Sequence, residues 1–149
     1  MMIDEDTGLK PDTPWHLWLA GILAVLWNAM GAFDYVMTQT RNEAYLASFT
    51  EEQLAFFTSF PTWMVFAWAT AIWTSVIGSV LLLFKSKFSV PVFGISIVSM
   101  LISYFHNYVL ENGAELMGAG GLLFTGVIII VAFALFFYAR GMAKRGVLA

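Results

Sequence analysis

The 149-residue chain contains no cysteine, which excludes a disulfide framework, a thiolate metal site and a cysteine nucleophile. Charged residues are also scarce, at 11% against 60% hydrophobic residues, whereas soluble domains carry about a quarter charged residues. With seven Lys and Arg and a net charge of −3, the chain lacks the basic patch that a nucleic-acid partner needs. These shortages indicate a membrane protein whose main partner is the lipid bilayer, with no nucleic acid bound.

Four apolar segments are long enough to cross a bilayer as helices, which takes about 20 residues. They cover about 15–39, 61–84, 88–110 and 116–139. None alternates polar and apolar residues at period two, so membrane strands are not expected. The acidic N-terminus lacks the apolar region and cleavage site of a signal peptide. The sequence therefore predicts an all-α membrane protein, a four-helix transmembrane bundle over 15–139, with a cytoplasmic tail at 1–14 and a basic cytoplasmic tail at 140–149.

Positive charge predicts the orientation of the bundle, because Lys and Arg are enriched in cytoplasmic loops. One side carries six of the seven, namely Lys10, Lys85, Lys87, Arg140, Lys144 and Arg145. Both termini are therefore expected inside. On the other side, Thr50 and Gln53 have the spacing of a capping box, and Leu54 and Phe57 share a helical face. A short amphipathic helix is expected in this outer loop between the first two spans, with or without a role as a lid.

Polar residues from three spans are expected near the outer surface. At about 1.5 Å per residue, Asp34 and His106 lie about 28 and 27 Å from the inner ends of their helices, and Glu115 begins the fourth span. Ionisable residues inside a membrane are candidates for a functional site. The predicted ligand-binding residues, which include polar neighbours at helical spacing in the first and third spans, are Asp34, His106, Glu115, Asn107, Ser103, Ser99, Thr38 and Asn28.

Three interpretations of these residues remain open. They could hydrogen-bond one another or interfacial water and so hold the bundle together. They could bind a solute or a proton, with Ser96, Ser99 and Ser103 as a hydrophilic wall leading into the membrane. Two carboxylates and an imidazole could also bind zinc or a non-haem metal, although no HExxH or similar motif is present. The sequence names no cofactor.

Other polar and small residues favour structural roles. Asn28 is expected to join two helices, or else to bind a ligand, and His16 to lie in the inner aromatic belt. Small residues that let helices approach closely recur on two spans, at Ala67, Ala71, Thr74 and Gly78 and again at Gly118, Gly121 and Thr125. The glycines at 118–121 begin no strand–helix unit and so are no dinucleotide motif. No second helix-borne histidine is placed to complete a bis-histidine haem site.

Two stretches carry a family resemblance, LWNAMGAFDYVMTQTRNEAY at residues 26–45 and TEEQLAFFTSFPTW at residues 50–63. With them the chain resembles a group of small four-helix bacterial inner-membrane proteins, some of which are labelled "sugar transporter". The resemblance covers most of the chain and implies a multi-pass protein of the bacterial inner membrane with a role in transport. It assigns no catalytic or binding residue.

The sequence leaves three functions open. The first is a non-enzymatic protein with an outward-facing polar pocket that binds or transports a small polar solute, alone or as a homo-oligomer. The second is an accessory or structural subunit of a larger membrane complex. The third is an intramembrane enzyme or a metal-binding protein, and for an enzyme the sequence lacks a recognisable nucleophile, thiol pair or haem ligand.

Overall fold

The computed structural model describes residue 9 and residues 11–149; most of the expected tail at 1–14 lies outside this part of the chain. The described residues form helices joined by short turns, with no strand. The order is α1 (Trp15–Gln39), α2 (Glu43–Leu46), α3 (Glu51–Thr58), α4 (Thr62–Leu83), α5 (Ser89–Phe105), the π-helix η1 (His106–Leu110) and α6 (Gly113–Lys144).

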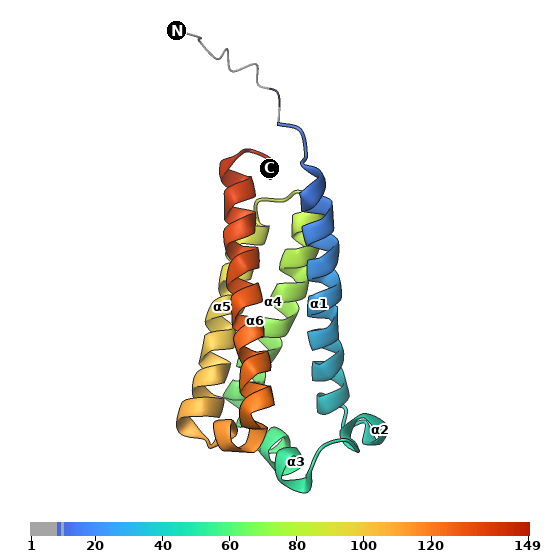
Figure 1. The fold of residues 1–149 in the computed structure, drawn as a ribbon, viewed down its shortest axis with the longest axis vertical. Coiled ribbons are helices and arrows are strands. Elements are labelled where there is room, and N and C mark those ends of the chain that lie inside the picture. Colours follow the sequence, from blue (N-terminus) through green and yellow to red (C-terminus); the bar gives the residue numbers. More distant parts are fainter. Residues whose placement is uncertain (1–8, 10) are drawn as a thin grey trace.

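The four long helices run side by side between two ends of the molecule (Figure 1). One end, called here the terminal end, carries the C-terminus and the loop between α4 and α5. The opposite end, called the connector end, carries α2, α3 and η1 (Figure 1). The spans α1, α4, α5–η1 and α6 contain 25, 22, 22 and 32 residues and are all long and apolar enough to cross a membrane. The chain is thus an all-helical protein with the four membrane-spanning candidates that the sequence predicted.

Small residues bring α4 close to its two neighbours. A Cβ built on Gly78 would lie 2.8 Å from the Phe93 ring of α5, and one on Gly21 of α1 would collide with Leu83. The hydroxyl of Ser96 also donates to the carbonyl of Ala71 at 2.7 Å. Close backbone approach of this kind is the main source of helix association in lipid. The small face predicted on the second span therefore packs α4 against α5.

The last residues of the chain are folded back onto the bundle. Val147 donates to Met142 at 3.0 Å and Gly146 to Ala143 at 3.1 Å, which is the Schellman pattern at a helix C-terminus. Gly146 has φ of 74°, a conformation that glycine adopts without steric cost. Residues 140–149, predicted as a basic cytoplasmic tail, therefore comprise the end of α6 up to Lys144 and a short segment folded onto the bundle.

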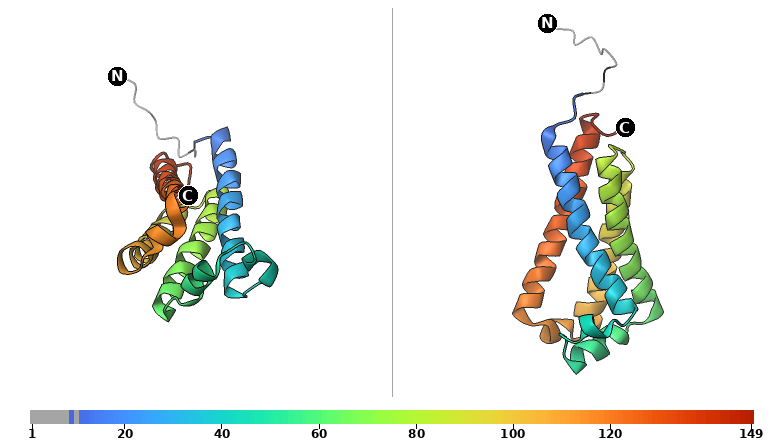
Figure 2. Two further views of the ribbon diagram at one scale, coloured as in Figure 1. Left: turned by 60° about the horizontal axis from the view of Figure 1, so that its bottom comes forward. Right: turned by 90° about the vertical axis from the view of Figure 1, so that its right-hand side faces the viewer.

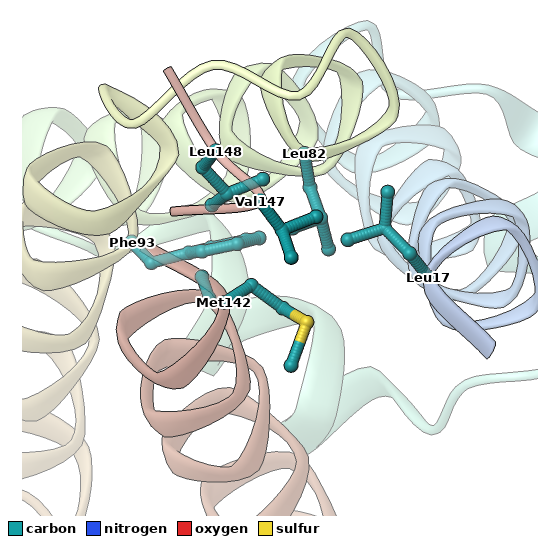
Figure 3. Packing of buried hydrophobic residues seen from close by; sticks show 7 residues of the cluster. Leu17, Leu82, Phe93, Met142, Val147 and Leu148 are labelled. Atoms are coloured by element: carbon teal, nitrogen blue, oxygen red, sulfur yellow. The ribbon is translucent and has the colours of Figure 1, made fainter. Parts of the chain in front are cut away.

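A hydrophobic cluster closes the terminal end (Figure 3). It is completed by the returning chain, whose Ala149 donates to the Lys85 carbonyl at 2.8 Å and accepts from the Lys87 amide at 3.0 Å. Its members come from every long helix and from the C-terminal segment, namely Leu17, Leu82, Phe93, Ala139, Met142, Val147 and Leu148. Well packed side chains thus hold α1, α4, α5 and α6 together at this end.

Candidate functional site

A cavity of about 550 Å³ occupies the bundle on the connector side of the terminal-end cluster. Side chains of all four long helices line it, together with Tyr45 and Phe49 near α2 and three phenylalanines at and after α3. Its volume lies within the range of about 300–1,000 Å³ found for small-molecule pockets. Most of the lining is apolar or aromatic, with a few polar groups among it. This combination is typical of ligand sites, where few polar groups fix the orientation of the ligand.

Asp34 lines the cavity and is hydrogen-bonded to a residue that the sequence interpretation missed. The Tyr45 hydroxyl donates to the Asp34 carboxylate. A turn at the end of α1 makes this contact, because Arg41 takes a left-handed conformation with φ of 53° and Asn42 donates back to Met37 at 3.0 Å. Burial and then the hydrogen bond to Asp34 raise the pKa of Tyr45 from 10.0 to about 12. Tyr45 is therefore a neutral donor at physiological pH.

The third span contributes a polar face that differs from the predicted one. Ser96, Ser103 and Asn107 line the cavity, whereas Ser99 and His106 do not. At 100° per residue, Asn107 lies about 20° around the helix from Ser96, but His106 lies about 80° away. The cavity-lining face of the third span is therefore rotated about the helix axis from the predicted one, toward Asn107 and away from His106.

His106 is buried, with 5% of its surface exposed, beside the start of α4. Its ring lies 5.1 Å from that of Trp63 and 5.7 Å from that of Phe60. Its Nδ1 is 3.1 Å from the side-chain oxygen of Asn107, the next residue. His106 thus positions a cavity residue from behind, and the expectation that it shares one pocket with Asp34 does not hold for this cavity.

Glu115 is exposed near the start of α6 and is not among the cavity-lining residues. Within residues 9 and 11–149, no three histidine, aspartate or glutamate side chains come together as a group that could hold a metal ion. The predicted cluster of Asp34, His106 and Glu115 is therefore separated in the described structure.

The other predicted polar residues do lie at the cavity. Asn28 donates to the Ser79 hydroxyl at 2.7 Å and to the Ser75 carbonyl at 3.3 Å, so it joins α1 to α4 while lining the cavity. Thr38 is buried and also lines it. His16, at the terminal end, has its Nδ1 2.5 Å from the hydroxyl of Tyr138 and links α1 to α6.

A tyrosine pair at the connector end was also missed by the sequence interpretation. Tyr104 and Tyr108 line the cavity with ring centroids 5.9 Å apart. The Tyr108 and Thr125 hydroxyls are 2.7 Å apart and join η1 to α6. Helical spacing did not indicate them, because at 100° per residue Tyr104 lies about 80° and Tyr108 about 120° around the helix from Ser96.

The glycines of α6 do not form the predicted helix–helix contact. Gly118 interrupts the helix with φ of 69° and has no described heavy atom within 4 Å of its built Cβ. A Cβ on Gly121 would meet Met117 of the same helix at 2.7 Å, and Gly121 lines the cavity. The break at Gly118 turns the first residues of α6 away from the main axis, so the small residues beyond it border the cavity.

Compared with protein-family models, with curated proteins and with solved structures, the chain matches none of them.

Proposed function

We propose that this protein is a multi-pass protein of a bacterial inner membrane that binds or transports a small molecule in the cavity between its helices. The observation that carries the proposal is a cavity of about 550 Å³ bordered by all four long helices and bounded at the terminal end by the hydrophobic cluster. Protein interiors are usually close-packed, so a space of this size between the helices can hold a ligand.

The proposed orientation places the terminal end in the cytoplasm and the connector end outside. Lys85, Lys87, Lys144 and Arg145 lie at the terminal end, which fits the enrichment of positive charge in cytoplasmic loops. A cytoplasm-only reporter fused after Ala149 is expected to be active, whereas one inserted near Thr50 is expected to be inactive. The reverse pattern would turn the cavity toward the cytoplasm.

A pair of alanines on α6 tests the binding site itself. Ala132 lines the cavity, whereas Ala134 is exposed on the outer surface of the helix. Ala132→Phe should fill part of the cavity, and Ala134→Phe should leave it unchanged. In native mass spectrometry of protein purified in mild detergent, we expect a small-molecule adduct with the wild type and Ala134→Phe that is lost in Ala132→Phe. An adduct equally present in both variants, or in none of the three proteins, would contradict a ligand site in the cavity.

A role as subunit of a larger complex is the second candidate, and the exposure of α6 favours it. Of the 32 residues in this helix, only Gly113, Ala139 and Met142 are buried. Gly120 and Gly126 have no described heavy atom within 4 Å of a built Cβ, which leaves a surface that another helix could approach closely. Light scattering of the gently extracted protein separates the two roles, because a mass well above that of one or two chains favours the subunit.

A further inference from the structure

The charge of the cavity is carried by one residue. Among the described residues that line it, Asp34 is the only acidic one, and none is a lysine, arginine or histidine. A negatively charged ligand would therefore meet a carboxylate with no cation beside it, and burying such a ligand unpaired is costly. A ligand with one positive charge would be paired by Asp34.

One aromatic residue contacts this carboxylate, and other aromatic rings line the rest of the cavity. Tyr45, its hydrogen-bond donor, has ring centroids of Phe33 at 5.7 Å and Phe49 at 6.0 Å. Further rings line the same cavity, namely those of Trp27 on α1, Trp68 on α4, Tyr104 on α5, Tyr108 on η1 and Phe124 on α6. Aromatic faces attract cations, and cages of such rings bind quaternary ammonium groups. One carboxylate within an aromatic lining thus fits an organic cation whose charge is masked by apolar groups.

The cavity is also open on the flank between α1 and α6. Met30 of α1 and Phe124 of α6 line it, yet they are 63% and 55% exposed. Figure 2 (right) shows α6 spreading away from α1 toward the connector end. Both residues belong to membrane-spanning candidates, so this side of the cavity faces the hydrocarbon region. A ligand that partitions into lipid could enter here.

We propose that the ligand of this cavity is a lipophilic organic monocation, paired by the carboxylate of Asp34, held by the aromatic rings of the cavity lining and admitted from the bilayer between α1 and α6. This inference rests on the proposed function, since it names the class of ligand for the same cavity. It replaces the small polar solute expected from the sequence, because the lining outside the Asp34 region is mostly apolar.

Two probes of matched shape and opposite charge test the class of ligand. Tetraphenylphosphonium and tetraphenylborate each carry four phenyl rings around one central atom. In equilibrium dialysis against the purified protein in neutral detergent, the phosphonium should bind saturably and at least tenfold more tightly than the borate. Asp34→Asn should weaken phosphonium binding at least tenfold. This variant keeps an oxygen that can accept from Tyr45, so the fold is expected to survive. Glu115→Gln removes an exposed carboxylate outside the cavity and should leave phosphonium binding unchanged.

Each contrary result has a definite meaning. Equal or tighter binding of the borate, or phosphonium binding that is unchanged in Asp34→Asn, would overturn the cation class. If phosphonium fails to bind while an adduct still depends on Ala132, the cavity is a ligand site of another class and only this inference fails. If neither phosphonium nor any adduct depends on the cavity, the proposed function fails with it. Wild-type-like elution and helical circular dichroism of Asp34→Asn exclude unfolding as the cause.

Discussion

Replacing Leu148 by alanine should destabilise the protein although this residue lies beyond the last helix. Leu148 is 4% exposed in the terminal-end cluster, where it packs with residues such as Leu82 and Phe93. Leu→Ala changes in protein cores cost about 2–5 kcal/mol through lost burial and the cavity left behind. Because the site lies at the end of the bundle beside Lys85 and Lys87, where water can relax the cavity, we expect a loss of about 2–3 kcal/mol.

The measurement is the free energy of unfolding by sodium dodecyl sulfate in mixed micelles, followed by circular dichroism. Leu9→Ala is the control, because it makes the same change at a leucine that is 81% exposed. Its change should stay within about 0.5 kcal/mol, as for ordinary surface substitutions. If both variants unfold at the same detergent fraction as the wild type, the C-terminal segment is not packed into the cluster. The cavity would then not be bounded at the terminal end as described.

Three further substitutions test local features of the structure. Gly113→Ala should lower the melting temperature, because its Cβ would collide with the backbone carbonyl of Asn107. Lys85→Gly should raise the free energy of unfolding by up to about 1 kcal/mol, since Lys85 has φ of 55° and such a conformation strains a side-chain-bearing residue. Tyr45 ionises at about pH 12 when folded against 10.0 otherwise, so its stabilising effect is complete below pH 10 and is lost as the pH rises to 12. The stability difference between wild type and Tyr45→Phe should therefore shrink over pH 10–12; a constant difference would contradict the bond to Asp34.

The four spans could be predicted because membrane helices need only length and apolar composition, which a single sequence displays. The capping box was also readable, and Thr50 and Gln53 exchange both of its hydrogen bonds at the start of α3. The close packing at Gly78 was predicted from small residues at helical spacing, although the pattern did not identify Phe93 as its neighbour. These features depend on residues a few positions apart, which is the range over which sequence patterns are reliable.

The candidate site was predicted only in part, because it depends on rotation and on chain reversals. Steps of three, four and three residues drift around a helix of 3.6 residues per turn, so grouping His106 with Ser96 put His106 on the wrong side of α5 and η1. The hydrogen bond from Tyr45 to Asp34 requires the turn at Arg41, which has a left-handed conformation. Glycine is the usual sequence signal for such a conformation, and this turn contains none. The burial of Leu148 depends on the turn at Gly146, which folds the residues after α6 back onto the bundle, and the pattern of basic residues at 140–149 predicted only a cytoplasmic tail.

Thiol accessibility along α4 tests the central claim, that a ligand can occupy the space between the helices. The chain has no cysteine, so a thiol reagent can react only with a cysteine that is introduced at a chosen position. Ser75 lines the cavity, whereas Ile77 lies two residues on and is exposed on the outer face. In proteoliposomes, a small cationic methanethiosulfonate should modify Ser75→Cys faster than Ile77→Cys, which lipid covers, and tetraphenylphosphonium should slow only the reaction at position 75. Equal rates at both positions, unaffected by the phosphonium, would contradict the account.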